Sequence, residues 1–256
     1  TMIRKGSGSA AGSVVVQAPG WQEERKLGQL VEDSGAVASR LEEALPEAIL
    51  TRRVFLRGLI SSPSGSAAVS LTAVDPHAEA QVNDLDDRLT EGAYLDEGTD
   101  GIVLGRTLAE TLGVGVGDKV VVLASSSGEM ASQLFRVRGL FSTGLDDIDA
   151  LCGQITLAAA QEMLQLGAGA NQIAGHMPST RDTRRATRGV TQVMAGEDRA
   201  ILPWNEALPQ LAEYAAFYEA QTYIMFAIMF AMVALGIVMV YSAAGVRAAD
   251  VYGQEH

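Results

Sequence analysis

An uninterrupted apolar run near the end of the chain constrains its fold more than any other feature. Residues 223–241 contain no charged residue, no proline and a single glycine. As an α-helix this run would be roughly 28 Å long, close to the ~30 Å hydrocarbon core of a bilayer. Tyr223 and Tyr241 stand at its ends, where amphipathic rings favour the headgroup layer. The alternative is a buried helix of a large soluble protein, but such helices seldom stay apolar on every face. We therefore predict a transmembrane helix at residues 223–241.

The residues before this run favour a continuous helix. Residues 206–222 contain strong helix formers, and their one proline, Pro209, falls in the first turn, where proline is tolerated. A helix over residues 205–241 would be on the order of 55 Å long, about 25 Å more than the bilayer core requires. We expect residues 206–222 to form a stalk outside the membrane, and residues 242–256 to form a tail.

The start of the chain has no matching membrane segment. The first residues lead into the Gly- and Ser-rich stretch 6–12 instead of an apolar core, so no signal peptide is predicted. We expect residues 1–12 to be a flexible lead-in that follows a missing membrane helix. Acidic residues before the apolar run and Arg247 after it weakly favour a folded part on the outer side of the membrane.

Composition narrows the function classes. The chain has 31 acidic and 19 basic residues, a net charge of -12, which disfavours nucleic acid as a partner. With Cys152 as its only cysteine, the chain cannot form an internal disulfide. The cysteine content therefore does not indicate whether the protein lies in a reducing or an oxidising compartment.

Hydropathy patterns predict alternating strands and helices. Residues 13–18 read as a strand, residues 27–45 as an amphipathic helix, and residues 48–60 and 67–74 as a hairpin. Further elements are expected in the order strand 101–105, helix 106–112, strand 119–124, tight turn 125–128, strand 134–141, helix 157–166, strand 172–177, helix to about 195 and strand 200–202.

The amino-acid composition of the chain changes at Asp75-Pro76, and we interpret this point as the start of an insertion. The predicted fold is α+β. Residues 13–75 and 167–205 form one domain, split βαββ/βαβ, and residues 76–166 form a smaller inserted β-rich domain.

Sequence motifs for nucleotide binding, metal binding or catalysis are weak in this chain. Gly113, Gly115 and Gly117 resemble a phosphate loop, but they follow a helix and open a strand, the reverse of a nucleotide fingerprint. The three histidines lack metal-ligand spacing, and no nucleophile motif is present. Asp146, Asp147 and Asp149 lack the later ligands of an EF-hand, so we interpret them as a solvated loop. We predict no catalytic, cofactor-binding or metal-binding residue, and no enzyme activity in this chain.

Two surfaces are candidates for partners. One is a basic stripe at helical spacing, with an ordinary solvated helix face as the alternative; the other is a methionine face within the apolar run, suited to lipid or to helix packing. The stripe consists of Arg181, Arg184, Arg185 and Arg188, and the methionine face of Met225, Met229 and Met232.

An ordered series of short motifs resembles one family. It includes Asp75-Pro76, Glu91 to Leu95 (EGAYL), Gly101 to Gly105 (GIVLG), Leu112-Gly113-Val114, Val116-Gly117-Asp118, Phe135 to Phe141 (FRVRGLF), Thr143-Gly144 and Trp204-Asn205-Glu206. The series is similar to the extracytoplasmic core of MacB-type and LolC/LolE-type ABC transporter permeases. In that family the larger domain is called Porter and the inserted one Sabre.

The resemblance implies a permease subunit, here a fragment, in the inner membrane with its main domain in the periplasm. Its partners would be a separate cytoplasmic ATPase, a second permease subunit in a homo- or heterodimer, and a lipoprotein or other exported substrate. ATP hydrolysis would drive periplasmic motions that release lipoproteins or export substrates. MacB-like efflux is one alternative, and a membrane-anchored interaction or sensor domain without an ATPase is another.

One departure from the family concerns the hairpin at residues 125–132. LolC-type subunits carry a longer hook there, which engages a soluble carrier, whereas this turn is short. The residues expected at its tip are Ser125, Ser126, Ser127 and Gly128.

Overall fold

The computed structural model describes residues 13–24, 27–126, 129–177, 183–194 and 199–203, together with residues 225–226, 229–230 and 232–233. The helices are α1 (Trp21–Glu24), α2 (Ser34–Ala44), α3 (Pro76–Val82), α4 (Arg106–Leu112), α5 (Asp146–Asp149), α6 (Leu157–Leu164) and α7 (Thr183–Val193). The strands are β1 (Val14–Gln17), β2 (Ile49–Ser61), β3 (Ser66–Val74), β4 (Leu89–Gly92), β5 (Gly101–Gly105), β6 (Lys119–Ser126), β7 (Glu129–Phe141), β8 (Cys152–Thr156), β9 (Gln172–His176) and β10 (Ala200–Pro203).

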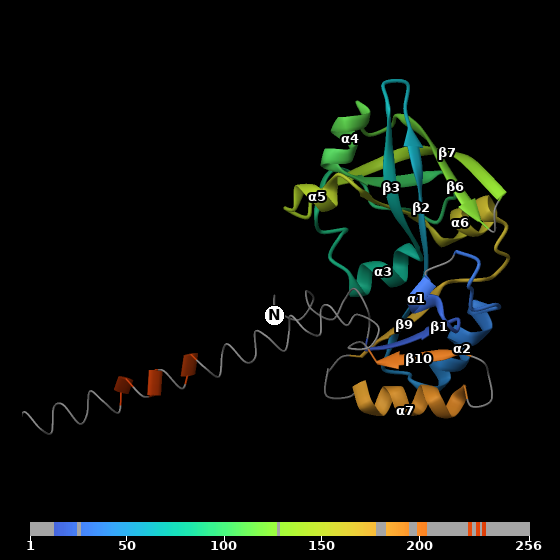
Figure 1. Ribbon diagram of the computed structural model, residues 1–256, viewed down its shortest axis with the longest axis vertical. Helices are drawn as coiled ribbons and strands as arrows, with labels where there is room; N and C mark the ends of the chain where they lie inside the picture. The colour runs from blue at the N-terminus through green and yellow to red at the C-terminus, as the bar shows by residue number, and fades with distance from the viewer. Residues whose placement is uncertain are drawn as a thin grey trace, which may run out of the picture. The chain divides into compact units, whose positions relative to one another are not determined.

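Six of these strands close into a barrel. The pairings run β2-β3-β8-β5-β7-β6 and return to β2, because β6 pairs with both β7 and β2. Inward-facing residues such as Ile60, Ile102, Val122 and Phe135 alternate with outward-facing ones along the strands. Residues of α4 and α6 join the same core. The upper part of Figure 1 is this barrel with its helices.

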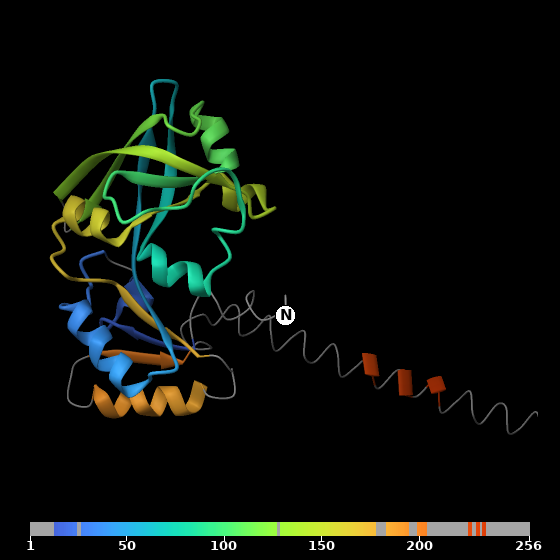
Figure 2. The same ribbon diagram turned by 180° about the vertical axis from the view of Figure 1, so that it is seen from behind.

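A second, smaller core lies under the barrel. Strands β10, β1, β9 and the first half of β2 form an antiparallel sheet, and α2 and α7 pack on it (Figures 1 and 2). Val37 and Leu41 of α2 meet Ala186 and Val190 of α7 in this core. These apolar residues recur at the three- and four-residue spacing of a helix face, which explains why both helices turn the same side inward.

Strand β2 belongs to both cores. Its first residues, Ile49–Arg53 in the pairing with β9, lie in the lower sheet, while Gly58 to Ser61 pair with β6 in the barrel. Gly58 allows this second pairing, because a Cβ added there would lie 2.1 Å from the carbonyl oxygen of Leu123. A single continuous strand therefore connects the two cores.

The expected α+β composition is confirmed, and most predicted elements are present. The helix predicted at residues 27–45 was placed too early, because Asp33 has the left-handed φ of 54° and α2 begins at Ser34. The helix predicted to reach residue 166 ends at Leu164, since Gln165 also has a positive φ, of 53°.

The hairpin turn predicted at residues 125–128 is narrower. Ser125 and Ser126 belong to β6 and pair with Met130 and Glu129, so the two strands extend into the predicted turn. Elements β4, β8, α1, α3 and α5 are absent from the sequence-based expectations.

The chain divides into two compact units, Thr1–Ala207 and Leu208–His256. The described strands and helices up to residue 203 all belong to the first, so the division into domains 13–75, 76–166 and 167–205 stays a prediction. No helix in the described part of the chain has the length and apolar character needed to span a membrane. The predicted stalk and most of the predicted membrane helix at residues 223–241 lie outside the described residues.

Candidate functional site

A buried charge pair lies between β2 and α3. Arg53 Nε donates to Glu79 Oε2 and Arg53 Nη2 donates to Glu79 Oε1, both at 2.9 Å. The side chains are only 4% and 2% exposed. This two-pronged geometry is the strongest form of an arginine–carboxylate contact. The pair fixes α3, the first element after β3, to the strand that both cores share.

Local sequence places Glu79 where it can meet Arg53. Asp75 caps α3, because its Oδ1 accepts hydrogen bonds from the backbone N–H groups of His77 (3.1 Å) and Ala78 (3.3 Å). Pro76 occupies the first helical turn, where its missing N–H costs nothing. Glu79 then falls in that turn, where the helix dipole favours a negative charge.

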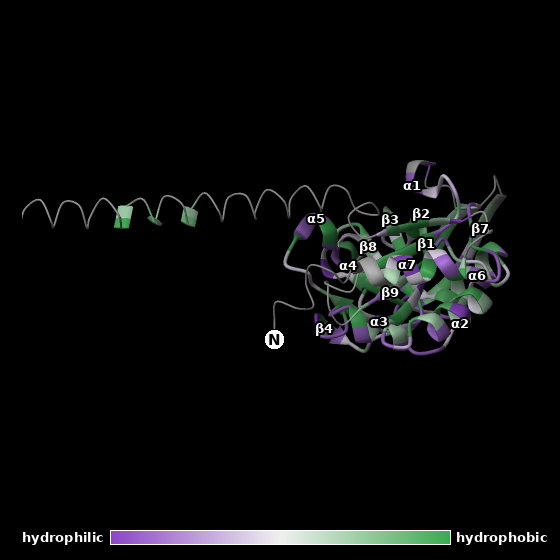
Figure 3. Ribbon diagram, turned by 90° about the horizontal axis from the view of Figure 1, so that it is seen from below, coloured by the Kyte–Doolittle hydropathy of each residue, from purple (hydrophilic) through white to green (hydrophobic). Residues whose placement is uncertain are grey.

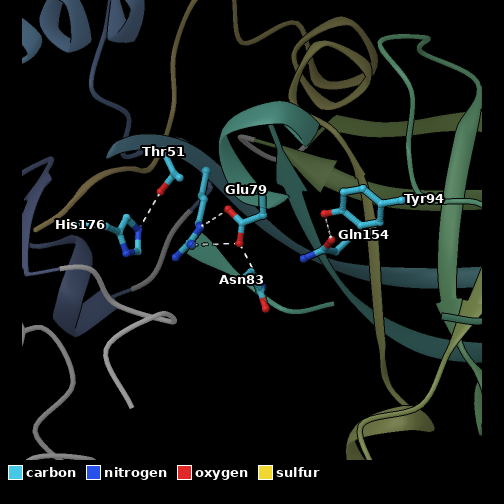
Figure 4. A network of polar contacts seen from close by, with 7 residues as sticks. Thr51, Glu79, Asn83, Tyr94, Gln154 and His176 are labelled. Atoms are coloured by element: carbon cyan, nitrogen blue, oxygen red, sulfur yellow. Dashed lines mark hydrogen bonds and ion pairs between the residues drawn. The ribbon is translucent and has the colours of Figure 1, made fainter. Parts of the chain in front are cut away.

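Neighbouring amides complete the pair. Asn83, one turn later, donates from Nδ2 to Glu79 Oε1 at 3.1 Å (Figure 4). Asn171 donates its backbone N–H to the carbonyl of Arg53 at 3.0 Å. The Asn171 side chain also accepts from the N–H of Phe55 at 3.0 Å and donates to the carbonyls of Leu27 and Gln29. Asn171 thus holds together backbone segments that are far apart in the sequence.

A neutral histidine lies beside the charge pair. His176 Nε2 is 3.2 Å from Thr51 Oγ1. Burial, followed by the positive charge of Arg53, lowers the pKa of His176 to about 3. His176 is therefore uncharged near neutral pH.

A partly buried tyrosine extends the polar set towards the barrel. Tyr94 donates from its hydroxyl to Gln154 Oε1 at 2.6 Å (Figure 4). Burial raises the pKa of Tyr94 well above its usual value, and the negative charges of Glu79 and Asp86 raise it further. The hydroxyl remains protonated and acts as a donor.

The arrangement favours a structural role over a catalytic one. Thr51, the only hydroxyl that contacts His176 among the described residues, is 1% exposed, so a substrate has no access to it. The described residues contain no group of three or more His, Cys, Asp and Glu side chains able to hold a metal ion. We call Arg53, Glu79, Asn83, Asn171 and His176 the junction.

The structure places only some of the residues predicted to contact partners. Arg184, Arg185 and Arg188 lie in α7, and Arg188 is exposed, while Arg181 is outside the described residues. Met225, Met229 and Met232 are exposed within the second unit. Ser125 and Ser126 end β6, and Ser127 and Gly128 lie outside the described residues. The basic stripe, the methionine face and the hairpin tip remain predictions.

The interpretation of Asp149 as part of a solvated loop is wrong. Asp149 is 1% exposed and accepts hydrogen bonds from the hydroxyls of Ser142 (2.9 Å) and Thr143 (2.7 Å) and from the N–H of Thr143 (2.9 Å). Burial raises the pKa of Asp149, but these hydrogen bonds outweigh it and hold the pKa below the ordinary value. Asp146 and Asp147 are exposed, as expected.

Sequence reasoning missed the junction. Arg53 and Glu79 are 26 residues apart, and nothing in their spacing pairs them. The one available signal was Asp75-Pro76, a helix start that places an acidic residue one turn later.

The sequence of the chain matches one protein family. Residues 2–193 match the model of the MacB-like periplasmic core domain. Two curated proteins named lipoprotein-releasing system transmembrane protein LolC, from Xylella fastidiosa strains Temecula1 and 9a5c, are each 33% identical to it over 104 residues. This stretch covers 38% of the chain and 25% of each LolC, so the chain spans about a quarter of the length of these relatives.

Two solved structures share the fold. The periplasmic region of MacB from Actinobacillus actinomycetemcomitans has a TM-score of 0.54 at 15% identity, covering 79% of this chain and 94% of that one. The extracellular domain of the noncanonic ABC-type transporter YknZ, from Gram-positive bacteria, has a TM-score of 0.53 at 12% identity, covering 74% of this chain and 98% of that one.

Proposed function

The chain belongs to the family of MacB-like periplasmic core domains, and we propose from this membership that it is the periplasmic core of a permease subunit in an ABC-type transporter. The family match carries the proposal, since it spans residues 2–193 and so includes the barrel core and most of the smaller core. The ATPase would be a separate cytoplasmic subunit, as the resemblance to LolC-type permeases implies.

Within this class we propose lipoprotein release as the activity. The relatives that support it are the two LolC proteins, at 33% identity. The substrate would be a lipoprotein in the outer leaflet of the inner membrane, and the work done on it would be mechanical.

The junction supports a mechanical role. A displacement is transmitted only through elements that do not deform. Strand β2 runs through both cores as one continuous strand. The two-pronged contact between Arg53 and Glu79 holds α3 to the same strand. A push on the lower sheet would therefore move the barrel with it.

The remaining predictions complete the proposed subunit. Residues 13–75 and 167–205 would be the Porter part and residues 76–166 the Sabre part, with a stalk at 206–222 and a membrane helix at 223–241. The second permease subunit would meet the basic stripe of Arg181, Arg184, Arg185 and Arg188, and lipid or a neighbouring helix would meet Met225, Met229 and Met232.

The test is purification of the complete permease from its native host with a tag on its cytoplasmic end. The proposal predicts that an ATPase subunit co-purifies and that its turnover rises when lipoprotein is added. Purification without an ATPase would instead favour the membrane-anchored sensor domain.

MacB-like efflux is the second candidate, and the fold shared with the periplasmic region of MacB favours it. The same preparation separates the two. Turnover that responds to a small amphiphile but not to lipoprotein would establish efflux and exclude release.

A further inference from the structure

The outer surface of the barrel carries an apolar patch. Leu59 of β2, Val121 of β6, and Met130 and Leu134 of β7 are between 41% and 65% exposed. We call these four residues the barrel patch. Contiguous apolar surface on a soluble domain often marks an interaction site.

Strand register makes the patch continuous. Val121 lies opposite Leu134, and Leu59 lies opposite Leu123 of β6, which is half-buried. Residues facing each other across adjacent strands have Cβ atoms about 5 Å apart. The patch is thus one surface that crosses three strands.

Basic side chains border this patch at both ends. Arg57 precedes Leu59 by two residues, Lys119 precedes Val121 by two, and Arg136 follows Leu134 by two. Alternation along a strand puts each of them on the same outer face, and all three are exposed. Lys119 lies directly opposite Arg136, an unfavourable pairing of like charges that a carboxylate would relieve. The patch therefore suits a partner that is apolar and acidic.

The same chain carries such a surface around α5. Leu145, Ile148 and Leu151 recur every third residue and are 42% to 58% exposed. Asp146 and Asp147 are exposed between them, and neither forms an ion pair within the described part of the chain. Figure 3 shows hydrophilic and hydrophobic residues side by side on α5. We call these five residues the acidic knob.

Hydrogen bonds and close backbone packing hold the acidic knob in a fixed position. Asp149 fastens it through the hydrogen bonds from Ser142 and Thr143. Its backbone rests against Gly105, where an added Cβ would lie 2.1 Å from the Asp149 carbonyl oxygen. A preformed surface loses little freedom on binding, which favours association.

The acidic knob cannot reach the barrel patch of its own chain. It packs beside β5 and β8, which stand opposite β2 and β6 in the ring of six strands. Figures 1 and 2 show α5 and the β6–β7 hairpin on opposite sides of the barrel. Two chains can make the contact that one cannot.

We propose that the acidic knob of one copy of this chain docks on the barrel patch of a second copy. Asp146 and Asp147 then lie against Arg57, Lys119 and Arg136, and the leucine and isoleucine side chains cover the exposed patch. Two different surfaces meet, so the contact is heterologous. It does not depend on the transport function, because it follows from the surface of the first unit alone.

Cysteine pairing tests the contact in the complete chain, purified in mild detergent. On a Cys152→Ala background, Ile148→Cys and Leu134→Cys are made as separate variants and mixed under mild oxidation. The proposal predicts a disulfide-linked dimer in the mixture, with several-fold less from either variant alone. Glu47→Cys, at an exposed residue before β2, replaces Leu134→Cys as the matched control and gives only background.

Equal yields from the mixture, the separate variants and the control would overturn the proposal. A strong product from Leu134→Cys alone would also overturn it, since it would mean that two patches face each other. A cross-link from Leu134→Cys to a different co-purifying protein, with no homodimer, would also overturn the proposal. It would assign the barrel patch to that partner.

A charge exchange between the acidic knob and the basic residues around the barrel patch is the control for cysteine variants that fail to fold. Asp146→Lys with Asp147→Lys, in the chain that bears Ile148→Cys, is predicted to reduce the cross-linked yield roughly tenfold through like-charge repulsion. Arg57→Glu with Lys119→Glu, in the chain that bears Leu134→Cys, restores most of that yield when mixed with it. Failure of the exchange to restore the yield would contradict the docking of these surfaces.

Discussion

Arg53 and Glu79 are full charges held away from water, and this determines how the junction responds to mutation. Removing two charges from water is costly, and their mutual attraction repays that cost only when the geometry is good and the remaining hydrogen bonds are made. Here Asn83 and the two-pronged contact meet both conditions. The pair is therefore sensitive to the loss of one partner more than to the loss of both.

Glu79→Gln is predicted to lower the free energy of unfolding by about 3 kcal/mol, because it leaves the Arg53 charge buried without a counter-ion. The matched control is Asp84→Asn, which removes the partly exposed pair with Arg88 and is predicted to cost less than about 1 kcal/mol. Urea unfolding can be followed by the fluorescence of Trp21, whose ring lies 5.4 Å from that of Phe55. Equal losses in the two variants would contradict the role given to the junction.

His176 predicts a pH dependence with a definite sign. Its folded-state pKa is about 3, below the ordinary value near 6.5, so the unfolded chain binds an additional proton between these pH values. The stability associated with neutral His176 is complete above pH 6.5 and falls as the pH drops towards 3. His176→Gln should reduce this fall by up to about 1.4 kcal/mol per pH unit near pH 5.

The direct measurement is an NMR titration of the folded chain. The ring signals of His176 should stay those of a neutral imidazole from pH 7 to pH 4.5. A midpoint for His176 near pH 6 would show that burial and Arg53 do not act as described.

Individual residues also show where sequence reasoning stops. Tyr94 and Gln154 are separated by 60 residues, and their hydrogen bond depends on how the barrel closes. Asp149 belongs to an acidic cluster typical of a solvated loop, yet the hydroxyls of Ser142 and Thr143 make its burial favourable. Contacts of this kind depend on the tertiary fold and leave no periodic pattern.

At the scale of elements, strands with strong alternation or β-branched residues were predicted well. β1, β2, β3, β5, β9 and β10 lie within a few residues of their expected bounds. β8 was missed because Cys152–Thr156 has a single large apolar residue, Ile155, and is buried by its neighbours β3 and β5 instead of by its own pattern. β4 was missed because Leu89–Gly92 is polar and pairs only along one edge of β7.

The closure of the barrel between β2 and β6 predicts the effect of a methyl group. Gly58→Ala is expected to destabilise the chain by about 1 to 3 kcal/mol, because its Cβ would overlap the Leu123 carbonyl unless β2 and β6 move apart. Gly65→Ala, in the β2–β3 turn, meets its nearest atom at 3.9 Å and should be close to neutral. Urea unfolding of both variants measures the difference, and similar midpoints would argue against close packing at this seam.

At the scale of the whole molecule, two cores share one long strand, and a buried charge pair fixes α3 to that strand. The shared strand suits a part that moves as one body, which is the role proposed for a periplasmic core driven by an ATPase. The sequence predicted the family and the α+β composition, since these depend on ordered motifs and on local hydropathy. It did not predict the closed barrel or the junction, which arise from pairings between distant segments.

The most direct test of the proposed function is lipoprotein release by the complete permease, reconstituted in liposomes with its ATPase and partner subunit. The account predicts that ATP transfers a membrane-bound lipoprotein to a soluble acceptor, and that Glu79→Gln slows this transfer more than Asp84→Asn does at equal amounts of folded transporter. ATP hydrolysis that proceeds at the same rate with and without lipoprotein, with no lipoprotein leaving the membrane, would contradict it.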